Sequence, residues 1–136
     1  MKLIAVCDFA EERFDYGERA VYGEFIFRGT QTFVGKIRLE FNAYSGDELR
    51  FIGKKIPPKE PFYDRYIELR FENAESAIKK FRVPNLTTSK NCMEAKIKLR
   101  ANEIVKIPSG GDSSGNYVRG YEALEIGTYH RCNPAP

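Results

Sequence analysis

The stretch TFVGKIRLEF, residues 32–41, alternates two kinds of side chain with a period of two residues. One parity holds apolar residues and a glycine, which are Phe33, Gly35, Ile37, Leu39 and Phe41. The other parity is mostly polar and holds Thr32, Lys36, Arg38 and Glu40. Successive side chains of a strand point to opposite faces, so this pattern predicts a half-buried antiparallel strand with its charged side chains outward.

The same alternation recurs in RYIELRFE, residues 65–72, and in EAKIKLRA, residues 94–101. Less regular strand candidates are KLIAV, VYGEFIFR, ELRFIG, NEIVKI and YEALEIGTY. Turn-forming stretches separate these runs, at residues 28–31, 43–47 and 109–116. Short strands punctuated by turns indicate a sandwich or a small barrel. Of the two, we expect an all-β, immunoglobulin-like antiparallel β-sandwich of about 7–9 strands with at most one short helix.

One segment, NAESAIKKF, residues 73–81, has the pattern of a short helix. Asn73 is placed to cap its first turn, Ala77, Ile78 and Phe81 share a face, and Pro84 ends it. The alternative interpretation is a loop followed by a short strand, IKKFRVP.

Length and composition are those of one globular domain, which we expect to span residues 1–136 with a frayed tail at 133–136. Apolar residues make up 42% and charged residues 30% of the chain, which excludes intrinsic disorder. The apolar run at residues 3–6 is too short for a signal peptide, and no stretch approaches the length of a membrane span. We therefore expect a soluble, cytoplasmic protein.

The net charge of +3 is unevenly distributed along the chain. Residues 1–35 carry 4 basic and 6 acidic groups, whereas residues 36–106 carry 16 basic and 10 acidic groups, a net charge of +6. Nucleic-acid binding requires a contiguous cationic face. The outward residues Lys36, Arg38, Lys96, Lys98 and Arg100 would form one if their strands were neighbours. The opposing interpretation is an ordinary solvent-exposed sheet surface with cross-strand ion pairs, because glutamates are interspersed among these cations.

The cysteines and the histidine give weaker signals. Cys7, Cys92 and Cys132 are odd in number and lack a Cys-x-x-Cys spacing, which argues against a disulfide framework and a zinc site. The only histidine, His130, would need further ligands from elsewhere to bind a metal ion. A small hydrolase or ribonuclease using His130 is an alternative hypothesis, although His130 lies near the chain end. We predict no cofactor, no metal site and no catalytic residue.

Two stretches resemble the N-terminal β-sandwich domain of arrestin-type proteins. The first is FDYGERAVYGEFIF followed by TFVGKIRLEF, with matching positions Phe14, Gly17, Val21, Gly23, Phe25, Ile37, Leu39 and Phe41. The second is FRVPNLTTSKNCMEAKIKLRA, with matching positions Pro84, Asn85, Leu86 and Ser89. The resemblance implies a two-sheet sandwich that acts as a binding adaptor through its sheet edges and loops.

These observations favour a non-catalytic binding or adaptor module that engages a protein partner through sheet edges and through loops at residues 54–64 and 108–116. Such a module includes a viral or mobile-element inhibitor and a structural subunit, and its exposed edges lead us to expect a homodimer. The alternative partner is a nucleic acid. The candidate binding residues are Lys36, Arg38, Lys54, Lys55, Lys59, Tyr63, Lys96, Lys98 and Arg100.

Overall fold

The computed structural model describes residues 1–42, 46–56, 67–84, 92–108 and 115–132. These residues form seven strands and one helix. In chain order the elements are β1 (Lys2–Arg13), β2 (Arg19–Asn42), β3 (Gly46–Ile56), β4 (Ile67–Phe71), α1 (Ala74–Lys80), β5 (Cys92–Ile107), β6 (Gly115–Ile126) and β7 (His130–Cys132). Among these elements there is no helix of the length and apolarity that crossing a membrane requires.

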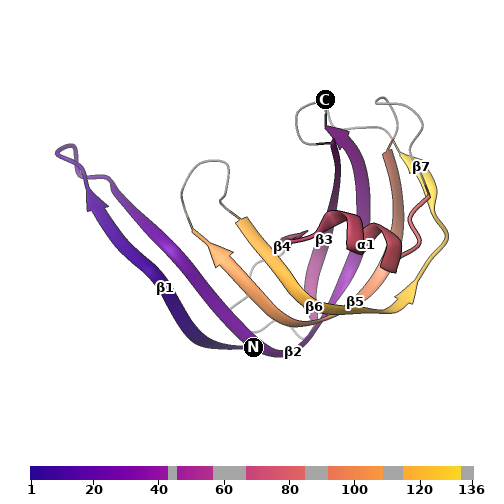
Figure 1. Ribbon diagram of the computed structural model, residues 1–136, viewed down its shortest axis with the longest axis horizontal. Coiled ribbons are helices and arrows are strands. Elements are labelled where there is room, and N and C mark those ends of the chain that lie inside the picture. The colour runs from indigo at the N-terminus through magenta and orange to yellow at the C-terminus, as the bar shows by residue number, and fades with distance from the viewer. Residues whose placement is uncertain (43–45, 57–66, 85–91, 109–114, 133–136) are drawn as a thin grey trace.

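All seven strands belong to one sheet, in the order β1-β2-β3-β4-β6-β5-β7, and an additional pairing joins β2 to β5. That pairing closes β2, β3, β4, β6 and β5 into a ring, the curved barrel of Figure 1. Four of the five pairings around the ring are antiparallel. The fifth, between β4 and β6, is parallel and short, with Arg70 opposite Tyr117 and Phe71 opposite Val118.

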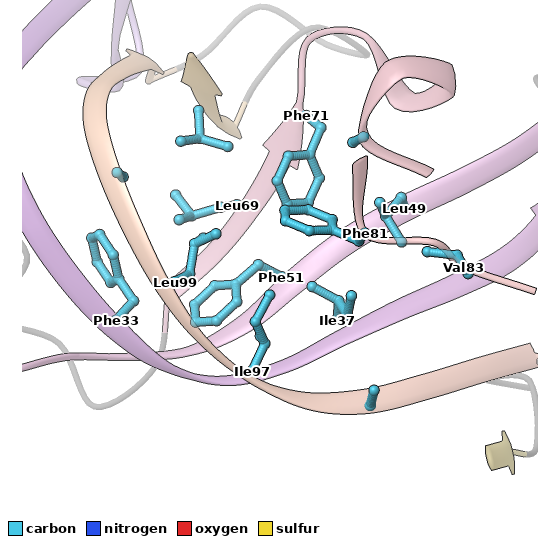
Figure 2. Packing of buried hydrophobic residues seen from close by; sticks show 14 of the residues in the cluster. Phe33, Ile37, Leu49, Phe51, Leu69, Phe71, Phe81, Val83, Ile97 and Leu99 are labelled. Atoms are coloured by element: carbon cyan, nitrogen blue, oxygen red, sulfur yellow. The ribbon is translucent and has the colours of Figure 1, made fainter. Parts of the chain in front are cut away.

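The apolar parity of the sequence faces the inside of this barrel. The largest fully buried side chains come from β2, β3, β4, β5 and β6, and include Phe33, Ile37, Leu39, Phe51, Leu69, Leu99 and Val118. They belong to a single core cluster, and Figure 2 shows Phe33, Phe51 and Leu99 close together within it. The predicted orientation of the alternating strands is therefore confirmed.

The helix prediction is also confirmed. Asn73 caps α1, because its Oδ1 accepts a hydrogen bond from the Ser76 amide at 3.0 Å. Ala77 and Phe81 are buried in the core. The Tyr129 hydroxyl donates a hydrogen bond to the Phe81 carbonyl at 2.8 Å, and burial raises the pKa of Tyr129 to about 12.

The all-β class with one short helix is thus confirmed, whereas the immunoglobulin-like sandwich is not. A sandwich needs two facing sheets. Here every described strand joins one hydrogen-bonded sheet that curls round onto itself, which corresponds to the small-barrel alternative.

β1 and the first half of β2 form a hairpin, the arm, which projects away from the barrel (Figure 1). Its pairing runs from Lys2 opposite Arg28 to Arg13 opposite Arg19. Within the arm, β1 leaves four large apolar side chains exposed, which are Leu3, Ile4, Val6 and Phe9.

The argument against disulfides was wrong for two of the three cysteines. Cys92 at the start of β5 and Cys132 in β7 are joined by a disulfide, and Cys7 is a free thiol. Spacing along the sequence could not reveal this bond, because the two cysteines are 40 residues apart and meet only through the β5–β7 pairing. Disulfides are typical of oxidising compartments, so this bond does not support the predicted cytoplasmic location, which stays a prediction.

A lysine-lined pocket on the barrel surface

The central half of β2 lies between β3 and β5, and this arrangement brings the predicted cations onto neighbouring strands. Along the β2–β5 ladder Lys36 is opposite Lys96, and Val34 is opposite Lys98. Arg38 is opposite Glu94. The condition set by the sequence, that the two basic strands be neighbours, is therefore met.

A surface pocket of about 740 Å³ lies over these strands and over the end of β6. Four lysines line it, which are Lys36, Lys54, Lys96 and Lys98. Apolar side chains of Val34, Ile52 and Ile126 also line it, and Glu125 is the one carboxylate of its lining among the described residues. We call this feature the lysine pocket.

Two short sequence triplets build the middle of the lysine pocket, Val34-Gly35-Lys36 in β2 and Ile52-Gly53-Lys54 in β3. They run antiparallel with Gly35 opposite Gly53, so that each lysine faces the apolar residue of the other triplet. Lysine and apolar positions therefore alternate across the face. The repeated apolar-Gly-Lys pattern was a signal in the sequence that could have pointed to Val34 and Ile52, which the prediction missed.

The glycines let the two strands approach closely here. A Cβ on Gly35 would lie 2.1 Å from the Ile52 carbonyl oxygen and 2.6 Å from the Gly53 Cα. Both are backbone atoms, which cannot rotate away. Glycine within a strand is typical of such close approaches and of bends at barrel corners.

The lysines differ in how they are neutralised. Lys36 Nζ lies 3.3 Å from Glu94 Oε2, and Glu94 Oε1 lies 3.3 Å from His130 Nε2. In the described part of the chain, no carboxylate oxygen lies within 4.0 Å of the ammonium group of Lys96 or Lys98. Like charges opposite one another, such as Lys36 and Lys96, destabilise a sheet unless an anion compensates them.

Glu94 supplies part of that compensation. Its partial burial alone would raise the pKa of its carboxyl, but hydrogen bonds from Lys36 and His130 and the charge of Arg38 lower the pKa overall. Glu94 is therefore ionised at neutral pH and is shared between Lys36 and His130. Among the described residues, Lys96 and Lys98 therefore form no ion pair within 4.0 Å, although Glu125 lies opposite Lys98 in the β5–β6 ladder.

The arginines of the candidate set are occupied by glutamates. Arg38 Nε lies 2.8 Å from Glu40, and Arg100 lies 2.6 Å from Glu122. Around these arginines the sheet is therefore an ordinary solvent-exposed surface with ion pairs, and the excess positive charge is concentrated at the lysines.

Three of the candidate residues remain, Lys55, Lys59 and Tyr63. Lys55 lies in β3 opposite Phe33 in the backbone register, whereas Lys59 and Tyr63 lie outside the described residues. Most of the two predicted binding loops, residues 57–64 and 109–114, is likewise outside them.

His130 lies in β7 and is exposed, with Glu94 as its partner. Within the described ranges, no group of three or more His, Cys, Asp or Glu side chains is arranged to hold a metal ion. His130 and Glu94 form a hydrogen-bonded pair next to Lys36, and the ribonuclease hypothesis stays a prediction.

No family model matches this chain, and neither a curated protein nor a solved structure matches it. The resemblance to arrestin-type domains therefore stays a prediction as well.

Proposed function

We propose that this protein binds single-stranded nucleic acid, with the lysine pocket as the centre of its binding surface. The observation that carries the proposal is the pair Lys96 and Lys98, whose ammonium groups form no ion pair within 4.0 Å among the described residues and lie beside an apolar surface. Phosphate groups of a bound strand neutralise these lysines, and the release of counterions from the strand drives binding.

The apolar part of the lysine pocket favours a single strand over a duplex. Val34, Ile52 and Ile126 offer a surface on which a nucleobase can pack. The bases of a duplex are stacked and paired, so this contact requires an unpaired strand. One nucleotide, with its base on the apolar residues and its phosphates at the lysines, matches the composition of the pocket.

The barrel topology supports the same class of ligand. If the barrel strands β2, β3, β4, β5 and β6 are renumbered 1 to 5 in chain order, they pair around the barrel as 1-2-3-5-4-1. The helix α1 connects the third strand to the fourth, and the parallel pair joins the third strand to the fifth. This is the strand order of the oligonucleotide/oligosaccharide-binding barrel, a five-stranded Greek-key architecture. Fold alone does not define function, so the topology supports the proposal only together with the lysine pocket.

Protein binding through edges and loops stays a second hypothesis. Its specific support is the arm, an edge hairpin with exposed apolar side chains. The loops on which it also relied lie mostly outside the described residues.

The direct test is fluorescence anisotropy with labelled single-stranded DNA and RNA of random sequence. We expect binding that weakens steeply between about 50 and 200 mM salt, as counterion release requires. Replacing both Lys96 and Lys98 with alanine should weaken binding at least about tenfold and reduce the slope of log K against log salt by about 1.4, because two phosphate contacts are lost.

The control removes the same charge elsewhere. Lys79 in α1 and Lys106 in β5 are exposed lysines that do not line the lysine pocket, and their double alanine variant should bind with nearly unchanged affinity. Equal losses in the two double variants, or no binding by the unmodified protein at low salt, would exclude the lysine pocket as a nucleic-acid site.

A further inference from the structure

The tip of the arm, residues 14–18, carries an exposed tyrosine stacked on a half-buried phenylalanine, with two exposed carboxylates beside it. Tyr16 stacks on Phe14 with ring centroids 5.4 Å apart, and 71% of Tyr16 is exposed. Asp15 and Glu18 flank Tyr16, and both residues are exposed. Within the described residues, no basic group lies within 4.0 Å of either carboxylate.

The tip and the lysine pocket are complementary in charge and in polarity. The tip offers two exposed carboxylates around an aromatic ring, and the lysine pocket offers the ammonium groups of Lys96 and Lys98 beside an apolar surface. The same difference in charge holds for the larger segments to which they belong, since residues 1–35 have a net charge of −2 and residues 36–106 a net charge of +6.

The geometry makes this complementarity intermolecular. The two strands of the arm, β1 and the first half of β2, are paired with each other along its length, as far as Arg13 opposite Arg19 next to the tip. Figure 1 shows the arm leading away from the barrel, so the tip is carried away from the pocket of its own chain.

We propose that the arm tip of one molecule docks in the lysine pocket of a second copy of this chain. Tyr16 packs against the apolar residues of the pocket, and Asp15 and Glu18 compensate Lys96 and Lys98. This contact does not depend on nucleic-acid binding, but it uses the same pocket. A bound strand and a docked tip therefore exclude one another.

A contact between two different surfaces of the same chain is heterologous, so each added molecule leaves one tip and one pocket free. Association is then open-ended, and it increases with protein concentration. Its exposed charge pairs are screened by salt, so the assemblies dissociate as ionic strength rises.

Sedimentation velocity of the full chain tests the contact. At about 50 mM salt, where screening is weak, we expect a sedimentation coefficient that rises with concentration. Reversing the tip charges, Asp15→Lys with Glu18→Lys, should weaken association at least about tenfold, and so should reversing the pocket charges, Lys96→Glu with Lys98→Glu. A control with the same change of net charge as the pocket reversal, Lys79→Glu with Lys106→Glu, should associate as the unmodified protein does.

A mixture of the tip-reversed and pocket-reversed chains should regain association, because each then offers a surface that matches the other. Circular dichroism of every variant checks folding. The contact is excluded if the unmodified protein stays monomeric at every concentration, if either reversed variant still associates normally, or if the mixture stays monomeric. Oligonucleotide binding by the tip-reversed chain, which keeps all four pocket lysines, separates this result from the proposed function: retained binding without association leaves that function intact.

Discussion

At the scale of single residues, Gly35 and Gly53 determine where β2 and β3 touch. Each lies opposite the other in the ladder, and the ideal Cβ positions collide with backbone atoms of the neighbouring strand. The apolar-Gly-Lys triplets therefore have a structural reason, since the glycines allow the close approach that sets the lysines around the pocket.

Replacing Gly35 with alanine should destabilise the protein by about 1–3 kcal/mol or more, because the added methyl group forces the strands apart. Urea unfolding followed by circular dichroism measures the free energy of unfolding. The matched control is Gly127→Ala, where the nearest atom to the new Cβ would be 3.5 Å away. An unfolding free energy of Gly35→Ala equal to that of the control would contradict the close contact.

The outward cations show what residue patterns predict and what they leave open. Alternation predicted correctly that Lys36, Lys96 and Lys98 face away from the core. It could not tell which cations are compensated, because Glu94 reaches Lys36 and Glu122 reaches Arg100 only through pairing across strands. It also missed Val34, since a lone apolar residue on a charged face has no meaning until its neighbours are known.

At the scale of elements, β7 depends on its disulfide. It has three residues and pairs only with β5 among the described strands, opposite Cys92, Met93 and Glu94. The disulfide holds β7 in place, and the β5–β7 pairing sets His130 opposite Glu94. A cross-link between residues 40 positions apart also restricts the unfolded chain.

Replacing Cys132 with serine should therefore lower the free energy of unfolding by about 2–4 kcal/mol. Thermal and urea unfolding with and without a reducing agent measure the effect: reductant should destabilise the unmodified protein and leave Cys132→Ser unchanged. The Cys7→Ser variant is the control, and it should respond to reductant as the unmodified protein does. A Cys132→Ser variant as stable as the oxidised protein would show that the bond contributes nothing.

Local signals predicted α1 correctly, but the turn expected at residues 28–31 was wrong, because β2 runs from Arg19 to Asn42 with only a register shift between Arg28 and Gln31. The helix followed from its cap at Asn73 and its buried Ala77 and Phe81. β7 was missed because a three-residue strand has no periodicity, and it exists through its partner and its covalent bond.

At the scale of the whole molecule, the sequence predicted an all-β chain but not how its sheet closes. Alternation has the same form in a sandwich and in a barrel, because each has one buried face. Two non-local events decide between them here, the pairing of β2 with both β3 and β5 and the short parallel pairing of β4 with β6. Neither pairing can be predicted from the residue pattern within a single strand.

The closed barrel places the lysines of three strands around one pocket, and this is the basis of the proposed function. The most direct measurement is an NMR titration of the nitrogen-labelled protein with a short single-stranded oligonucleotide. We predict that the amide shifts concentrate at residues 34–36, 52–54 and 96–98, and that they vanish in the Lys96→Ala, Lys98→Ala double variant. Shifts confined to the arm or to α1, or no shifts at low salt, would contradict the account.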